Sequence, residues 1–208
     1  DVEEPNGHLF FKPEPLGEQT VSLGIPLVDE RLCSGCRACV DFCRFNALAF
    51  IKSRPVVFPS VCHACGGCAL VCPTGAISEV QKPVGTVSRG VSDGVWVHTG
   101  MLQPGEASGV PLIRRLLSDS AKEDVSLRVI DCPPGSACAV MVSVGAADYC
   151  VLVAEPTIYG AHNPAMVHEL VELLGKPLGV VLNKCTSGES PSEAYCATHA
   201  LPIVGRID

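Results

Sequence analysis

The sequence predicts an α/β protein in which a body built on a parallel sheet carries a small inserted α+β unit. Three observations support this prediction. A motif of four cysteines occurs twice between Cys33 and Cys72. Further along, short and almost continuously apolar runs occupy residues 127–130, 149–154 and 178–182, as is typical of strands covered on both faces. Helix start and stop signals lie between these runs, which indicates parallel strands joined by crossover helices.

Both cysteine motifs have the spacing C-x2-C-x2-C-x3-C. Cysteines spaced in this way can bind three corners of an iron–sulfur cubane, and in proteins with two such motifs the fourth cysteine binds the cluster of the other motif. The sequence therefore predicts two [4Fe-4S] clusters with crossed ligand sets. The first set is Cys33, Cys36, Cys39 and Cys72, and the second set is Cys62, Cys65, Cys68 and Cys43.

A zinc ribbon and a disulfide framework are the alternatives. A zinc ribbon has two C-x2-C pairs separated by about 15 to 20 residues, whereas the eight cysteines here form two unbroken groups of four. A disulfide framework is disfavoured because 13 cysteines is an odd number and nothing else indicates an oxidising compartment. Small residues inside the motifs, such as Gly35 and Gly66, favour clusters because they let the backbone approach the sulfur atoms.

The repeat extends beyond the cysteines, since residues 28–33 correspond to residues 58–62 and residues 47–50 to residues 76–78. Each half is predicted to contain a short strand, a cysteine loop, one helical turn and a second short strand. Two such halves form a bacterial ferredoxin, which we place at residues 25–83.

The segments around this unit give simpler signals. Residues 1–24 are turn-like and then rich in proline and glycine, which predicts a loop. Residues 85–89 and 94–98 are predicted as two strands around a Ser-Asp-Gly turn. A helix with one apolar face is expected from Pro111 onward.

Two more helices have recognisable ends. One is predicted to start with Asn163 as the N-cap and Pro164 at the first helical position, and to end at Gly175. The other starts with a capping box that runs from Ser190 to Glu193. These helices would cross over between the predicted parallel strands.

Polar segments follow the three predicted strands, at residues 131–135, 155–157 and 183–184. Ligands of parallel sheets bind at the carboxyl ends of the strands. An aspartate after a buried strand, followed by a glycine with an open amide, suits a magnesium ion and a terminal phosphate. The same residue types also end strands in ordinary turns, so both interpretations stay open on these residues alone.

Six features in chain order resemble the MinD-superfamily P-loop ATPases that carry an inserted ferredoxin. They are residues 1–6, the two cysteine motifs, Gly105 with Glu106, residues 131–135, residues 155–157, and Asn183 with Lys184. The resemblance implies a parallel-sheet body of the P-loop NTPase type (MinD/ParA). Residues 1–24 and 84–208 would belong to this body, and residues 25–83 would be the ferredoxin insert.

The resemblance also implies roles for four residues. Asp1 would lie near the attacking water, Asp131 in the magnesium shell, Gly135 at the γ-phosphate and Asn183 at the adenine. ATP and Mg²⁺ would be cofactors of a longer protein that acts as a homodimer, and its Gly-rich, Lys-containing loop would lie upstream of Asp1. Residues 1–208 have no such loop, so we do not expect them to hydrolyse ATP by themselves.

A related family, the nitrogenase iron protein, holds a cluster between two subunits, and Cys138 falls where one of its ligands would lie. The segment expected to supply the partner ligand, residues 103–109, has no cysteine. We therefore expect Cys138 to bind no cluster, and the same expectation holds for Cys132, Cys150, Cys185 and Cys196.

The composition limits the partners. Charged residues make up 18% of the chain and the net charge is −7, which argues against nucleic acid or an anionic membrane as a partner. The longest apolar segment, residues 138–147, is far shorter than the ~18 residues that a membrane span requires, and no signal peptide is evident. We therefore predict a cytoplasmic protein without a membrane span.

Three functions fit these observations. The leading hypothesis is ATP-dependent electron transfer to a redox partner protein. The second is a carrier that uses ATP to bind and release an iron–sulfur cluster or another metal cargo. The third is a plain ferredoxin-type electron carrier with a structural α/β body. A complete set of eight cysteine ligands favours resident clusters over a transferable cluster.

Overall fold

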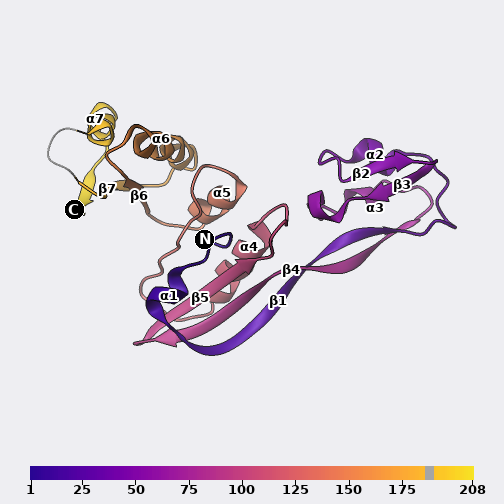
Figure 1. Ribbon diagram of the computed structural model, residues 1–208, viewed down its shortest axis with the longest axis horizontal. Helices are drawn as coiled ribbons and strands as arrows, with labels where there is room; N and C mark the ends of the chain where they lie inside the picture. The colour runs from indigo at the N-terminus through magenta and orange to yellow at the C-terminus, as the bar shows by residue number, and fades with distance from the viewer. Residues whose placement is uncertain (186–189) are drawn as a thin grey trace. The chain divides into compact units, whose positions relative to one another are not determined.

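The structure is a computed structural model that describes residues 1–185 and 190–208, without the side chains of residues 158–163. The chain divides into two compact units (Figure 1). One is Val2–Ser120, and the other is Ala121–Asp208 together with Asp1.

A long antiparallel ribbon forms the first unit. Strand β1 (Glu14–Val28) pairs with β4 (Ile77–Ser92), and β4 pairs with β5 (Val95–Leu102). Between β4 and β5, Asp93 and Gly94 both have positive φ, 48° and 79°, as a type I′ hairpin turn requires. The two strands predicted around this turn are confirmed, although both are longer than expected.

The prediction of a loop over residues 1–24 is wrong for most of this segment. A short helix, α1, covers Gly7–Phe11 and β1 follows it. Proline and glycine suggested a loop, but β1 lies at the edge of its sheet, where proline is tolerated. Pro15 also lies at an irregularity in the pairing with β4. Pairing with β4 therefore overrides the local signal.

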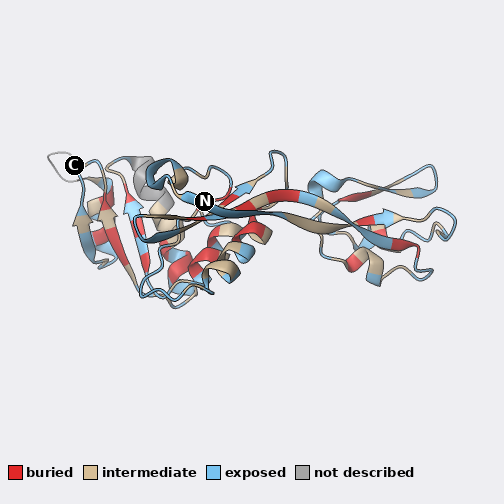
Figure 2. Ribbon diagram, turned by 90° about the horizontal axis from the view of Figure 1, so that it is seen from below, coloured by how far each residue is buried: buried red, intermediate tan, exposed pale blue. Residues whose placement is uncertain are grey.

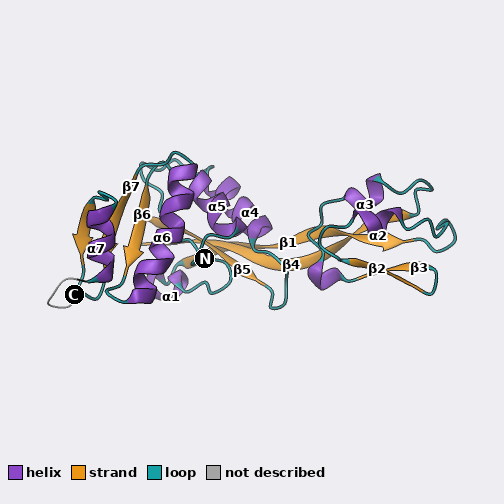
Figure 3. Ribbon diagram, turned by 90° about the horizontal axis from the view of Figure 1, so that it is seen from above, coloured by secondary structure: helices purple, strands orange, loops and turns teal. Residues whose placement is uncertain are grey.

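The cysteine-rich part follows β1 and precedes β4 in the chain, and Figure 3 shows it at one end of these paired strands. Its elements are α2 (Ala38–Phe42), β2 (Leu48–Ile51), β3 (Arg54–Val57), the 3₁₀ turn η1 (Pro59–Val61) and α3 (Gly67–Leu70). Strands β2 and β3 pair antiparallel. The order of strand, cysteine loop, helical turn and strand occurs twice as predicted, but β1 and β4 are long strands where short strands were expected.

Helix α4 (Val110–Ser120) packs on the ribbon through the apolar face that the sequence predicted. Leu112 is fully buried and Ile113 nearly so. A Cβ atom on Gly85 would lie 2.6 Å from Cδ2 of Leu112, and one on Gly100 would lie 2.8 Å from Cδ1 of Leu116. Glycines in β4 and β5 therefore allow the helix to approach the strands closely.

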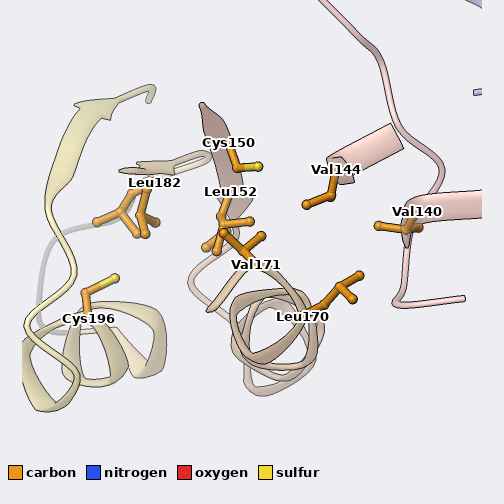
Figure 4. Packing of buried hydrophobic residues seen from close by; sticks show 10 residues of the cluster. Val140, Val144, Cys150, Leu152, Leu170, Val171, Leu182 and Cys196 are labelled. Atoms are coloured by element: carbon orange, nitrogen blue, oxygen red, sulfur yellow. The ribbon is translucent and has the colours of Figure 1, made fainter. Parts of the chain in front are cut away.

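The second unit contains a parallel sheet in the order β6-β7-β8, which confirms the predicted parallel pairing. Its strands are β6 (Cys150–Ala154), β7 (Leu178–Leu182) and β8 (Ile203–Arg206), and its helices are α5 (Cys138–Gly145), α6 (Ile158–Leu173) and α7 (Pro191–Thr198). A cluster of buried residues from α5, α6, α7, β6 and β7 forms the core on one side of the sheet (Figure 4).

Two predictions about these strands are wrong. Residues 127–130 form no strand, and Leu127 and Val129 are 78% and 85% exposed. A strand requires a hydrogen-bonding neighbour, and in the described part of the chain β6 pairs with β7 alone. Strand β6 is also not covered on both faces, because Val151 and Val153 are 55% and 59% exposed between buried neighbours. Figure 2 shows both buried and exposed residues on the strands of this unit.

The predicted helix ends are confirmed with one exception. Helix α6 begins at Ile158 and contains Pro164 in its interior, so the predicted start at Asn163 is wrong; the side chain of Asn163 lies outside the described residues. Gly175 ends the helix as predicted, with a φ of 64° and an N–H that donates to the carbonyl oxygen of Glu172. The capping box between Ser190 and Glu193 is present at the start of α7.

Among the helices in the described ranges, none is both long enough and apolar enough to cross a bilayer.

Candidate metal centre

The four cysteines of the first predicted set line one cavity. Cys33, Cys36 and Cys39 come from the first motif, and Cys72 comes from the second. Val28 and Ile77, at the facing ends of β1 and β4, line the same cavity. The antiparallel pairing of these two strands therefore brings the end of the second motif next to the first motif, as the crossed assignment requires.

Left-handed backbone conformations shape the first cysteine loop. Gly35 and Arg37 have φ values of 72° and 67°, and α2 begins at the next residue, so that Cys39 lies in its first turn. Burial raises the pKa of the Cys39 thiol, and the neighbouring Cys36 and Cys72 act in the same direction. Metal binding would remove this penalty, because a coordinated cysteine is a thiolate whose charge is neutralised by the metal.

Cys72 has the opposite balance. Burial acts to raise its pKa, but hydrogen bonds to the sulfur outweigh burial and lower the pKa. The donors are the Thr74 hydroxyl, whose Oγ1 lies 3.7 Å from Sγ, and the main-chain N–H groups of Thr74, Gly75 and Ala76. This turn therefore stabilises a thiolate at the crossed position of the first set.

The second set begins in the loop before α3. The N–H of Ala64 donates to Sγ of Cys62 at 3.4 Å. Burial raises the pKa of the Cys68 thiol, and the nearby Cys62 and Cys65 thiols act in the same direction. Three of the four predicted ligands are thus close enough to influence one another.

Two phenylalanines place Cys43 beside this second loop. A Cβ atom on Gly67 would lie 2.1 Å from a ring carbon of Phe42, so Phe42 packs directly over Gly67. The ring of Phe45 stacks on His63 with 4.0 Å between ring centroids. Cys43 lies between the two phenylalanines, and its Sγ accepts a hydrogen bond from the N–H of Ala47 at 3.3 Å. Sequence reasoning missed these contacts, which no local pattern signals.

The chemistry of the cysteines fits iron–sulfur clusters. In the described ranges no three His, Cys, Asp or Glu side chains are close enough together to hold one metal ion. All 13 cysteines, each of them among the described residues, are free thiols, and all-thiolate ligation is typical of iron–sulfur clusters.

The residues that the resemblance assigns to a nucleotide lie in the other unit. The main-chain nitrogen of Asp1 donates to the carbonyl oxygen of Asp131 at 2.5 Å, and the side chain of Asp131 is 72% exposed. Gly135 has a φ of 87° in the loop before α5. Asn183 follows β7, where its N–H donates to the carbonyl oxygen of Ala154. The structure thus brings Asp1 to Asp131, whereas Asn183 is held at the end of β6.

An ion pair of 2.7 Å joins Glu155 and Lys184 at the ends of β6 and β7.

The cysteines outside the two motifs differ in environment. Cys150 and Cys196 are buried in the core, and Cys138 is exposed at the start of α5. Cys132 and Cys185 are partly buried, and their thiols donate to main-chain carbonyl oxygens.

Comparison with known proteins supports the metal centre. Residues 32–76 match the family described as a 4Fe-4S dicluster domain. A 57-residue stretch is 39% identical to indolepyruvate oxidoreductase subunit IorA of Pyrococcus horikoshii, covering 26% of this chain and 9% of that protein.

Two uncharacterised proteins of Methanocaldococcus jannaschii match a larger part of the chain. MJ0578 is 28% identical over 186 residues, and MJ0579 is 22% identical over 185 residues. Each match covers 88% of this chain, which spans only 65% and 66% of the two relatives. These similarities support the iron–sulfur region and give no support to a P-loop ATPase body. The chain therefore contains a ferredoxin-type 4Fe-4S dicluster domain at residues 32–76.

Proposed function

We propose that this chain transfers electrons to a redox partner protein through two [4Fe-4S] clusters held by the crossed cysteine sets. One observation carries the proposal: thiols from both motifs, Cys33, Cys36, Cys39 and Cys72, line a single cavity. The arrangement around Phe42 and Phe45 supports the second set, because it brings Cys43 to the other loop.

The protein's own groups hold and tune the ligands. The N–H groups of Ala47 and Ala64 donate to the sulfur atoms of Cys43 and Cys62. Such hydrogen bonds stabilise the extra negative charge of a reduced centre and raise its reduction potential. Each cluster, when bound, takes up and releases one electron. Cys36 and Cys65 are the exposed members of the two sets, so they offer the shortest route between a centre and a partner surface.

Metal analysis tests the proposal. Protein purified without oxygen is expected to contain about eight iron atoms and about eight inorganic sulfides per chain. Cys68→Ala should lose one cluster, which reduces both numbers to about four, because the second set loses one of its ligands. Cys196→Ala, at a buried cysteine outside both sets, is the matched control and should keep the full content. Stoichiometric zinc without sulfide would refute the proposal.

A second candidate function couples these clusters to ATP in a longer homodimeric protein. It is supported by the contact between Asp1 and Asp131, which the ATPase resemblance places at one nucleotide site. The relatives, which are longer than this chain, leave room for a phosphate-binding loop. In the longer protein, ATP with Mg²⁺ should change the reduction potential or the rate of oxidation, and Asp131→Asn should abolish the change while leaving iron and sulfide intact.

A carrier of an iron–sulfur cluster or another metal cargo is the function that we would infer in place of ATP-coupled electron transfer. It would be indicated if the longer protein hydrolysed ATP while the potential, the electron-transfer rate and the partner affinity were all indifferent to nucleotide. If the longer protein did not bind ATP at all, we would infer a plain ferredoxin-type electron carrier.

A further inference from the structure

A half-open groove lies beside the first cysteine set, within the unit Val2–Ser120. Its volume is about 300 Å³, and its walls come from the end of β1, from β3 and from β4. Cys33 lines both this groove and the cavity of the first cysteine set. A molecule in the groove would therefore touch a residue that we propose as a cluster ligand.

The walls of the groove favour a flat apolar molecule. Most lining side chains are aliphatic, and three of them are the prolines Pro26, Pro55 and Pro59. Proline rings are rigid and have no N–H group to satisfy, so a planar ring can pack on them at little entropic cost. Binding sites for small molecules commonly combine such walls with a few polar groups.

The polar side chains at the wall decide which substituent fits. Arg54 forms an ion pair with Glu30, and the two side chains are 52% and 70% exposed. Because exposed ion pairs contribute little free energy, Arg54 is free to donate a hydrogen bond to a bound molecule as well. An acid would be repelled by the neighbouring Glu30, whereas a neutral carbonyl oxygen accepts from Arg54 without that penalty.

We propose that the groove binds a quinone, with one carbonyl oxygen at Arg54 and the ring against the prolines next to Cys33. This inference rests on the proposed function, since it gives the first cluster a small-molecule electron acceptor. Reduction of the quinone to its hydroquinone would take up two protons from water and two electrons, and the two clusters, when bound and reduced, would be the source of one electron each. Each quinone oxygen would receive one proton, and the two electrons would enter the ring, which becomes aromatic.

Binding is tested on the oxidised protein, where no turnover occurs. Menadione is the probe, and equilibrium dialysis and ligand-detected NMR measure its affinity. We expect one site with a Kd of about 0.1 to 1 mM, which is typical of a small ligand in a half-open site. Arg54→Gln should weaken binding about three- to tenfold through loss of the charged hydrogen bond. Arg31→Gln is the matched control, because Arg31 pairs with Asp29 outside the groove.

Substitutions that fill the groove provide a second measurement. Val57→Trp and, independently, Pro59→Trp should abolish saturable binding, and the reduced wild-type protein should reduce menadione with a rate that saturates. A rate that rises linearly up to the solubility limit, or wild-type affinity in both tryptophan variants, would overturn the inference. Iron and sulfide content is measured on every sample. Absence of both from the wild-type protein would mean that the proposed function has failed, whereas full wild-type content without menadione binding would mean that only the groove inference has failed. A variant enters the binding comparison only if its iron and sulfide content equals that of the wild type.

Discussion

At the scale of single residues, hydrogen bonds to the sulfur atoms distinguish the pKa values of the predicted cysteine ligands. Cys72 lies in a turn whose donors lower the pKa of its thiol, although burial acts against them. Cys39 lines the same cavity, and burial raises the pKa of its thiol. Of these two thiols, the one at the predicted crossed position, Cys72, is therefore the one that hydrogen bonds, first of all from the Thr74 hydroxyl, stabilise as a thiolate.

Thr74→Val tests this role. The substitution keeps the side-chain volume but removes the hydroxyl that lies 3.7 Å from Sγ of Cys72. We expect the potential of the first cluster to fall by about 20 to 60 mV, since 59 mV corresponds to a tenfold change for a one-electron couple. A redox titration followed by EPR measures the shift. Thr86→Val, on β4 away from the cysteines, should leave both potentials unchanged, and an equal shift in both variants would contradict the assignment.

At the scale of elements, the contact between α4 and the ribbon depends on missing side chains. Gly85 lies where β4, β5 and α4 meet, and its absent Cβ leaves room for both the carbonyl oxygen of Met101 and the side chain of Leu112. This contact holds the base of the ribbon, from which β1 and β4 extend to the cysteine loops.

Gly85→Ala should therefore destabilise this unit. The new Cβ would lie 2.4 Å from the carbonyl oxygen of Met101 and 2.6 Å from Cδ2 of Leu112. Because backbone atoms cannot move aside easily, we expect a loss of about 1 to 3 kcal/mol in the free energy of unfolding. Urea unfolding followed by circular dichroism measures it. Gly17→Ala on β1, where the space around the Cβ position is open, is the control, and equal losses in the two variants would contradict the packing argument.

At the scale of the whole molecule, the parallel sheet has an exposed apolar face. Helices α6 and α7 pack on one face, and Val151, Val153 and Val204 are each more than half exposed on the strands. Parallel sheets normally have both faces covered.

We expect the 208-residue chain to self-associate through this face. The double substitution Val151→Thr with Val153→Thr should reduce association, because exposed apolar patches drive contacts between copies. Sedimentation velocity over a range of concentrations measures the effect. Val56→Thr with Val95→Thr, at exposed valines on strands of the other unit, is the matched control. Association that is unchanged in the first pair, or reduced equally in both, would contradict this prediction.

The sequence by itself determined the features that depend on near neighbours. The cysteine spacing indicated iron–sulfur ligands, in agreement with the match of residues 32–76 to a 4Fe-4S dicluster domain, while the crossed sets stay a prediction. The capping box at Ser190 and the glycine at 175 marked real helix ends. These signals are reliable because a loop of three thiolates or a helix cap is complete within a few residues. The continuous apolar runs at β6 and β7 also indicated a parallel sheet correctly.

Only the tertiary structure decided which segments pair or pack with another part of the chain. Residues 14–24 looked like a loop and became part of a long strand, because β4 supplies hydrogen bonds along their length. Residues 127–130 looked like a strand and have no pairing neighbour among the described residues. The contact of Phe42 with Gly67 and the groove beside Cys33 likewise join residues from separate segments. Strand pairing and packing depend on the partner that the fold brings near, and a local pattern carries no information about that partner.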